Sequence, residues 1–182
     1  MNKSLIMTAA TVLATVLIIP VVFSDDDRHA ARQHSLGVAP VVLDAYKNEC
    51  SSCHMAYPPG LLPASSWQKI MTGLDAHFSD NAELDSESYK IISDFLLSNS
   101  ADNSDYRRSR KIMRSLNTGD APLRISELPY IKREHHELPD KMIKFNPKVN
   151  SLANCIACHT DAEKGLFNEH QVNIPGYGRW DD

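Results

Sequence analysis

The chain has 182 residues, with 19 basic and 23 acidic side chains and a formal net charge of −4. This length allows one domain or two small ones. The acidic balance argues against nucleic-acid binding and favours neutral or basic partners.

An uncharged, apolar segment opens the chain. It runs from Leu5 to Phe23, after Lys3 and before three consecutive aspartates that begin at Asp25. A basic start and an apolar run are typical of export, but this run is longer than the usual core of a signal peptide and just short of a comfortable membrane span. We therefore expect residues 1–24 to be a cleaved signal peptide, with an uncleaved membrane anchor as the alternative, and residues 25–40 to be a polar leader.

The predicted first half, residues 41–100, begins with a short helix that leads into Cys50-Ser51-Ser52-Cys53-His54. Three prolines and a glycine between residues 58 and 63 then predict a turn. Ser65 or Ser66 is expected to cap a helix that continues to about Phe78, because apolar residues recur on one face of that segment.

A second helix of this half is predicted over about residues 86–97, with Asp85 as its N-cap. Polar residues 98–105 resemble a linker into the predicted second half, residues 101–182. The basic stretch Arg107–Arg114 predicts a helix that has a solvated face and is closed by Gly119, with haem-propionate pairing or partner docking as the alternatives.

Another short helix, capped by Ser126, is predicted to end near Glu137. Asn150-Ser151 is then expected to cap the segment that carries Cys155-Ile156-Ala157-Cys158-His159. Glycine and proline make the tail irregular. These patterns predict a mainly α fold of short helices and long irregular connections.

The two pentapeptides share the pattern C-x-x-C-H, which is the attachment signature of c-type haem. The thiols add to the haem vinyl groups, and the adjacent histidine ligates iron. All four cysteines of the chain lie in these motifs. A zinc ribbon would place its two pairs roughly 15–20 residues apart, but about a hundred residues separate them here. We predict two covalent haems bound through Cys50, Cys53, Cys155 and Cys158, with His54 and His159 as iron ligands.

The second axial ligand of each iron decides the chemistry, because histidine gives a low potential and methionine a higher one. No methionine follows His159, so the second haem takes its distal ligand from His170 or from an upstream residue. His77 is favoured as a ligand because a polar ring on the flank of an apolar stripe needs a partner. One of His135 and His136 is the other candidate.

Other residues are weaker candidates for ligation. His29 and His34 lie in the polar leader, whereas Met71 and Met113 occupy apolar helical positions that suggest core packing. Met55 directly follows a ligand and cannot easily turn back to the same iron.

The run from Glu49 to Pro63, which contains Met-Ala-Tyr-Pro-Pro-Gly-Leu-Leu-Pro after the first motif, resembles the first haem site of the bacterial dihaem cytochrome c family, DHC type. The segment that ends Gly-Leu-Asp-Ala-His77-Phe78, the Arg-Glu-His135 stretch and the second motif also resemble that family. The similarity spans about residues 45–175. The chain departs from it at Tyr130-Ile131, where the family more often has a tryptophan.

The resemblance implies a periplasmic, low-potential electron carrier with two bis-histidine haems, in which His77 and His135 match the distal ligands. It also implies a membrane b-type cytochrome or another quinol-linked donor, and a small c-type cytochrome as acceptor. We expect one-electron transfer rather than an enzyme. The alternatives are a dihaem peroxidase or reductase, which needs an open iron and acid–base groups, and a membrane-anchored haem subunit of a respiratory complex.

Overall fold

The computed structural model describes residues 37–180, together with Arg28 and Ala31. The predicted signal or anchor segment 1–24, most of the polar leader, and His29 and His34 lie outside the described residues. Within the described part, no helix has the length and apolar character needed to cross a membrane.

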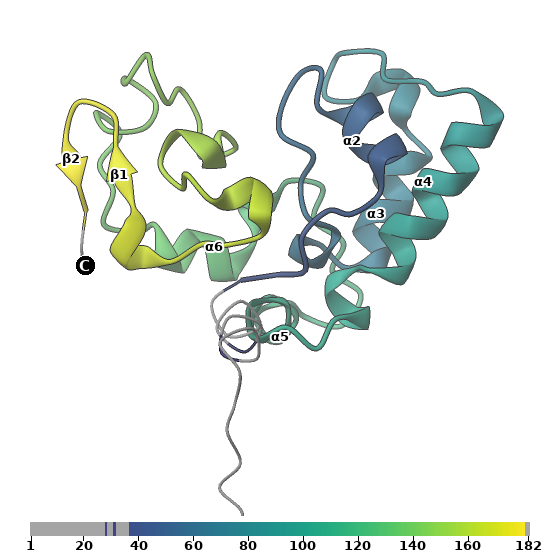
Figure 1. Ribbon diagram of the computed structural model, residues 1–182, viewed down its shortest axis with the longest axis horizontal. Helices are drawn as coiled ribbons and strands as arrows, with labels where there is room; N and C mark the ends of the chain where they lie inside the picture. Colours follow the sequence, from purple (N-terminus) through teal and green to yellow (C-terminus); the bar gives the residue numbers. More distant parts are fainter. Residues whose placement is uncertain (1–27, 29–30, 32–36, 181–182) are drawn as a thin grey trace, which may run out of the picture.

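Two lobes are joined through a central helix (Figure 1). The first lobe contains α2, α3 and α4, and the second contains α6 and a small hairpin, with α5 below and between them. The bounds are α2 Asp44–Cys50, α3 Ala64–Met71, α4 Ser86–Ser98, α5 Arg107–Ser115 and α6 Pro129–Glu134. The hairpin pairs β1 Asn173–Ile174 with β2 Gly178–Arg179 in antiparallel register. The predicted mainly α fold of short helices and irregular connections is therefore confirmed.

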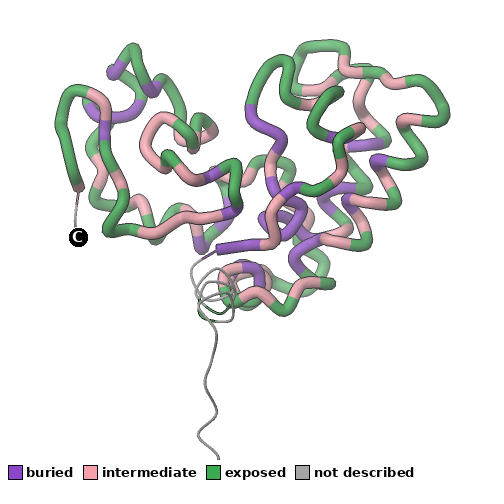
Figure 2. The backbone as a smooth tube through the Cα atoms, viewed as in Figure 1, coloured by how far each residue is buried: buried purple, intermediate pink, exposed green. Residues whose placement is uncertain are grey.

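Two clusters of buried side chains stabilise the described chain (Figure 2). The larger one joins α2, α3 and α4 to residues beyond residue 100, including Ile112, Leu128 and Tyr130. The smaller one contains Met142, Ile143, Val149 and Ile174 in the second lobe. Four buried residues make a thin core, as expected where a large apolar cofactor completes the packing.

The predicted cap of α4 is present in the structure. The Asp85 carboxylate accepts hydrogen bonds from the backbone N–H groups of Glu87 and Ser88, at 2.9 and 3.0 Å. Two of the four N–H groups that a helix leaves without a partner are thereby satisfied. This helix ends at Ser98, within one residue of its predicted end.

The predicted helix from Ser65 or Ser66 to Phe78 is wrong at both ends. The α3 helix begins at Ala64 after Pro63, and Ser66 is buried inside it. Neither serine caps it; the backbone N–H of Ala64 donates instead to the Asp102 carboxylate at 2.9 Å. It ends at Met71, because Gly73 disfavours helix and the chain tightens into a 3₁₀ turn over Leu74–Ala76. His77 therefore lies in a turn after that segment rather than on the flank of a long helix.

Three further predictions need correction in the second half. The α5 helix stops at Ser115, four residues before Gly119. Pro129 begins α6, since proline suits the first helical position, and Ser126 does not cap it. The second motif forms a 3₁₀ turn, Cys155–Ala157, that follows Asn154 without a side-chain cap.

The segment predicted as a linker is packed rather than free. Ser100 and Ala101 are fully buried or nearly so. The backbone N–H of Ala101 donates to the carbonyl of Leu62 at 2.8 Å. The segment thus fastens the end of α4 to the proline-rich turn that follows the first motif.

Candidate haem sites

The first site is built where α2 ends. Its last residue is Cys50, and Cys53 and His54 follow in the turn. His54 Nδ1 lies 2.7 Å from the carbonyl oxygen of Met55. Because a carbonyl only accepts, Nδ1 carries the proton, and Nε2 keeps the lone pair that a metal needs.

His77 faces His54 across the first cavity. The centroids of the two rings are 6.3 Å apart, and the ring planes differ by 34°. The turn that holds His77 is strained, since Phe78 and Ser79 both have positive φ, 51° and 87°. The Arg124 guanidinium lies 4.0 Å from the centroid of the Phe78 ring and covers this turn.

The first cavity has a volume of about 410 Å³. The motif side chains Cys50, Cys53 and His54 line it together with His77. Apolar side chains from α3 and α4 form much of the remaining wall: Trp67, Ile70, Met71 and Leu96. An apolar cavity with a few converging nitrogen and sulfur atoms is the kind of site that encloses a porphyrin.

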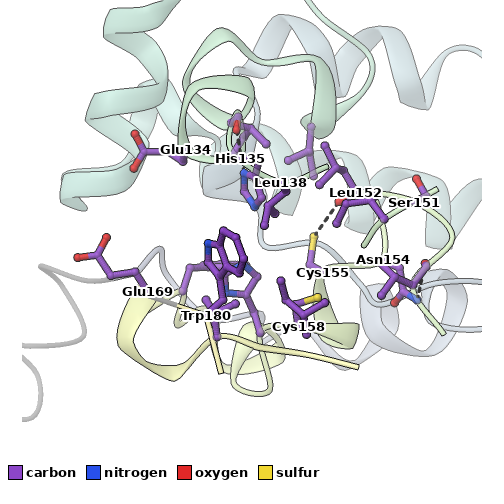
Figure 3. Close-up of a pocket in the computed structure, with 18 of the residues that line it drawn as sticks. Glu134, His135, Leu138, Ser151, Leu152, Asn154, Cys155, Cys158, Glu169 and Trp180 are labelled. Carbon is purple, nitrogen blue, oxygen red and sulfur yellow. Dashed lines mark hydrogen bonds between the residues drawn. The ribbon is translucent and has the colours of Figure 1, made fainter. Parts of the chain in front are cut away.

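The second site lies in the other lobe, between the end of α6 and the second motif (Figure 3). His135 approaches from the end of α6, and Cys155 and Cys158 lie on the facing wall. The His135 and His159 ring centroids are 6.1 Å apart, with planes 76° from parallel. The His135 Nδ1 lies 2.8 Å from the Ile131 carbonyl oxygen, which leaves its Nε2 free of a proton.

The spacing of the rings fits one metal atom between each pair. A metal bound at about 2.0 Å by two imidazole nitrogens on opposite sides would separate the ring centroids by about 6.3 Å. Both observed separations agree with this value to within a few tenths of an ångström. The second cavity, about 250 Å³, is lined by Leu138, Val149, Phe167 and Trp180 as well as the motif residues.

Burial favours the uncharged forms of the imidazoles and thiols that line the two cavities. It lowers the pKa of His159 to about 4, with help from His135 and the Arg108 charge, so the imidazole is neutral at pH 7. Burial also lowers the pKa of His77, followed by the effect of His54. The thiols of Cys50 and Cys155 have pKa values raised to about 11, chiefly by burial. A neutral thioether therefore suits these positions better than a thiolate.

The two cavities adjoin each other. Ile125, Leu152 and Cys155 line both of them. Tyr57 spans the boundary, because its ring stacks on His54 at 4.7 Å between centroids. Its hydroxyl donates to the carbonyl of Ala153, two residues before Cys155, at 2.7 Å.

The other candidates lie away from the paired rings. His136 bonds to the Arg133 carbonyl and its side chain is 70% exposed. Met71 is part of the first cavity wall and of the core, and Met113 packs at the edge of that core. His170 is exposed and lines neither cavity.

Sequence reasoning missed Arg108. It treated the 107–114 stretch as one unit, mainly as a solvated face with haem-propionate pairing or partner docking as alternatives, and did not single out Arg108, which lines the second cavity. The Arg108 guanidinium donates to the Tyr130 hydroxyl at 2.8 Å and to the Phe167 carbonyl at 2.7 Å. Helical periodicity contained the signal, because Arg108 is four positions before the buried Ile112 and so lies on the same side of the helix.

Comparisons with known proteins find a matching family and similar solved structures. The family model of dihaem cytochrome c matches residues 46–167, more than half of the chain. A diheme cytochrome type c from Shewanella baltica OS155 is 42% identical with a TM-score of 0.64, and the match covers 76% of this chain and 97% of that one. The diheme cytochrome c from Rhodobacter sphaeroides is 46% identical, also with a TM-score of 0.64, and 71% and 100% are covered. A comparison with curated proteins found no match.

Proposed function

Because the chain belongs to the dihaem cytochrome c family, we propose that it is a periplasmic, low-potential electron carrier in which two histidines ligate each haem iron. Its two c-type haems are covalently bound through the two C-x-x-C-H motifs. Each haem supplies one-electron redox chemistry, and ligation by two histidines holds its potential low.

The observation that carries the proposal is the pairing of imidazoles in both cavities. His77 lies opposite His54 and His135 opposite His159, each at the spacing that one metal atom requires. The proposed ligand sets are therefore His54 with His77 and His159 with His135. Axial ligands on both sides leave no coordination position for a substrate, which favours a carrier over an enzyme.

The acid and base groups that a peroxidase or reductase would use do not converge on the paired imidazoles of the second site. His136 is largely exposed, and Glu134 lines the second cavity but directs its carboxylate away from His135 (Figure 3). General acid–base catalysis needs such groups within hydrogen-bond reach of the reacting atoms. This arrangement supports a carrier that passes electrons from a membrane b-type cytochrome, or another quinol-linked donor, to a small c-type cytochrome.

The ligand assignment is tested by three single variants of the holoprotein. In the oxidised protein we expect two low-spin haems and no methionine–iron charge-transfer band. His77→Ala and His135→Ala should each leave one haem high-spin or bound by an added ligand, as measured by electron paramagnetic resonance. His136→Ala is the matched control, because it removes the adjacent exposed imidazole, and it should change neither signal. Two unchanged low-spin haems in His77→Ala would show that the proposed ligand is wrong.

A further inference from the structure

The α5 helix presents a stripe of positive charge to solvent. Arg107, Arg110, Lys111 and Arg114 are spaced i, i+3, i+4 and i+7, so they share one face, and all but the half-buried Lys111 are exposed. The opposite face holds the buried Ser109 and Ile112. This helix therefore has one side fixed in the core and one side that is wholly basic.

The charge of this stripe is not neutralised within the described part of the chain, where none of its four residues forms an ion pair. The arrangement opposes two electrostatic preferences of helices. Like charges at i, i+3 and i+4 repel one another. The first turn also carries basic residues and no acidic one, where the helix dipole favours negative charge. Such a conflict with local preference is characteristic of functional surfaces.

A second helix extends the stripe. Lys111 from α5 and Arg133 from α6 both lie over the ring of Tyr130, at 5.7 and 5.3 Å from its centroid. We call these residues the basic face: Arg107, Arg110, Lys111 and Arg114 on α5, and Arg133 on α6. Of the five, Arg133 is the one that has an acidic neighbour within the described chain, since its Nε lies 3.6 Å from Glu134 Oε1.

Charge is strongly segregated around the basic face. Residues 107–133 contain eight Lys or Arg and only two acidic residues. The remaining chain contains eleven basic and 21 acidic residues. A negatively charged surface would attract this region and repel the rest of the molecule, so it would also set the orientation of the domain.

The described chain begins beside α5, on the side of the helix opposite the basic face. Ser109 of α5 donates to the Gly60 carbonyl at 2.8 Å, and a Cβ on Gly60 would lie 2.7 Å from Ser109 Oγ and 3.5 Å from Val38 Cβ. Figure 1 shows the start of the described chain beside α5. In sequence, thirteen residues separate Gly37 from the apolar run that ends at Phe23. They can reach across at most roughly 50 Å when extended.

From these observations we propose that the basic face docks the haem domain on an anionic phospholipid surface. The partner class follows from the charge of the face, which complements an anionic surface. The docking does not require the apolar run, and it does not depend on the identity of either redox partner; where the run is retained, the short segment before Gly37 keeps the domain close to the membrane. The acidic first lobe would then face away from the membrane.

The test is sedimentation with phosphatidylglycerol-containing vesicles and with phosphatidylcholine vesicles, with bound protein measured by haem absorbance. The holoprotein beginning at Asp25 is used, so that the apolar run does not insert. The solved relative from Rhodobacter sphaeroides is a folded protein, and its whole length corresponds to 71% of this chain. We expect binding to the anionic vesicles only, and loss of that binding at high salt.

The decisive variant combines Arg107→Gln, Arg110→Gln and Arg114→Gln. Each basic residue near an anionic surface strengthens binding about fivefold, so this variant should bind about a hundredfold more weakly. The matched control, Lys69→Gln, Lys90→Gln and Lys148→Gln, removes the same charge from other exposed positions and should lose a few-fold at most. Equal losses in the two variants, or wild-type binding that does not depend on phosphatidylglycerol, would overturn the proposal.

If the wild-type protein does not bind the vesicles, and only the α5 variant reacts more slowly with an acidic redox protein, the face serves a protein partner instead.

Discussion

Tyr57 joins the two haem sites through one side chain. Its ring stacks on His54 with 26° between the planes, and its hydroxyl reaches the Ala153 carbonyl in the segment that leads to the second motif. Burial raises its pKa to about 12, with a smaller effect of Cys155, so the hydroxyl remains a donor at neutral pH. One residue therefore both orients a ligand of the first site and fastens it to the second.

The ring and the hydroxyl of Tyr57 can be separated by substitution. Tyr57→Phe should lower the free energy of unfolding by about 1 kcal/mol, because it removes one hydrogen bond, and should leave the first haem's paramagnetic resonance signal unchanged. Tyr57→Leu should also shift that signal, because the stack that holds the His54 plane is lost. Tyr89→Phe, at an exposed ring, is the control for stability. A first-haem signal that is unaltered in Tyr57→Leu would contradict the positioning role.

The angle between the paired imidazole planes differs between the sites, at 34° in the first and 76° in the second. When the two planes are nearly perpendicular, the imidazoles donate almost equally to the two iron d orbitals of π symmetry. This near-equality increases the anisotropy of the g tensor. We therefore expect two distinct low-spin signals in the oxidised holoprotein, with the larger anisotropy at the second haem. His135→Ala should remove the more anisotropic signal and His77→Ala the other. Two identical signals would contradict the observed ring geometry.

The motif residues could be predicted from sequence because covalent attachment fixes their spacing. His77 and His135 were also named from sequence as ligand candidates, on local environment and resemblance. Their pairing with a particular motif could not be predicted, since His77 follows its motif along the chain and His135 precedes its own. Only the tertiary structure brings each ring to the cavity it lines.

At the scale of single elements, local signals succeeded where one side chain decides the boundary. Asp85 supplies the oxygen that caps α4, so the start of that helix could be predicted from the sequence. The end of α3 could not be predicted, because the apolar spacing continues through Leu74 and Phe78 after the helix has stopped at Met71. Phe78 remains 40% exposed in a strained turn, which shows that the periodicity past Gly73 did not reflect a buried helix face.

The cap of α4 predicts a specific dependence of stability on pH. Hydrogen bonds from Ser88 and Glu87 lower the pKa of Asp85 below its usual value of 3.8. Because the folded value is the lower one, the stabilisation is complete above the pKa of the unfolded chain and disappears as pH falls through that of the folded protein.

Two substitutions of Asp85 separate the charge from the cap. Asp85→Asn keeps an acceptor oxygen without a charge, so its melting temperature should fall less than that of wild type between neutral pH and pH 3. Asp85→Ala should lower the melting temperature at neutral pH, because it removes the acceptor itself. Thermal unfolding followed by helical circular dichroism measures both effects. Parallel pH profiles for wild type and Asp85→Asn would show that the cap does not titrate as described.

At the scale of the whole molecule, the sequence gives the net charge but not its distribution. Residues 41–100 carry eight acidic and three basic side chains, and exposed carboxylates of Glu49, Asp80 and Glu83 line the first cavity. The residues of the basic face all belong to the segment 107–133, and none of them lines the first cavity. In the folded protein the charge is thus divided between two surfaces of opposite sign, the acidic rim of the first cavity and the basic face.

This segregation predicts where a basic electron acceptor binds. We expect the double variant Glu49→Gln with Glu83→Gln to slow the oxidation of reduced protein by a small basic c-type cytochrome several-fold at low ionic strength, because charges at the rim of an interface act mainly on the association rate. Stopped-flow mixing measures that rate. The effect should vanish at high salt, where the Debye length falls to about 3 Å.

The control for this prediction is Asp94→Asn with Glu163→Gln, which removes two exposed carboxylates that do not line the first cavity. It should change the rate little, because a docked partner responds to the charges it faces and only weakly to the net charge. If the two double variants slow the reaction equally, net charge rather than the acidic rim steers the encounter. Peroxide or nitrite reduction by the isolated protein at enzymatic rates, with no acceptor present, would instead contradict the carrier function itself, since that turnover requires an iron with an open position.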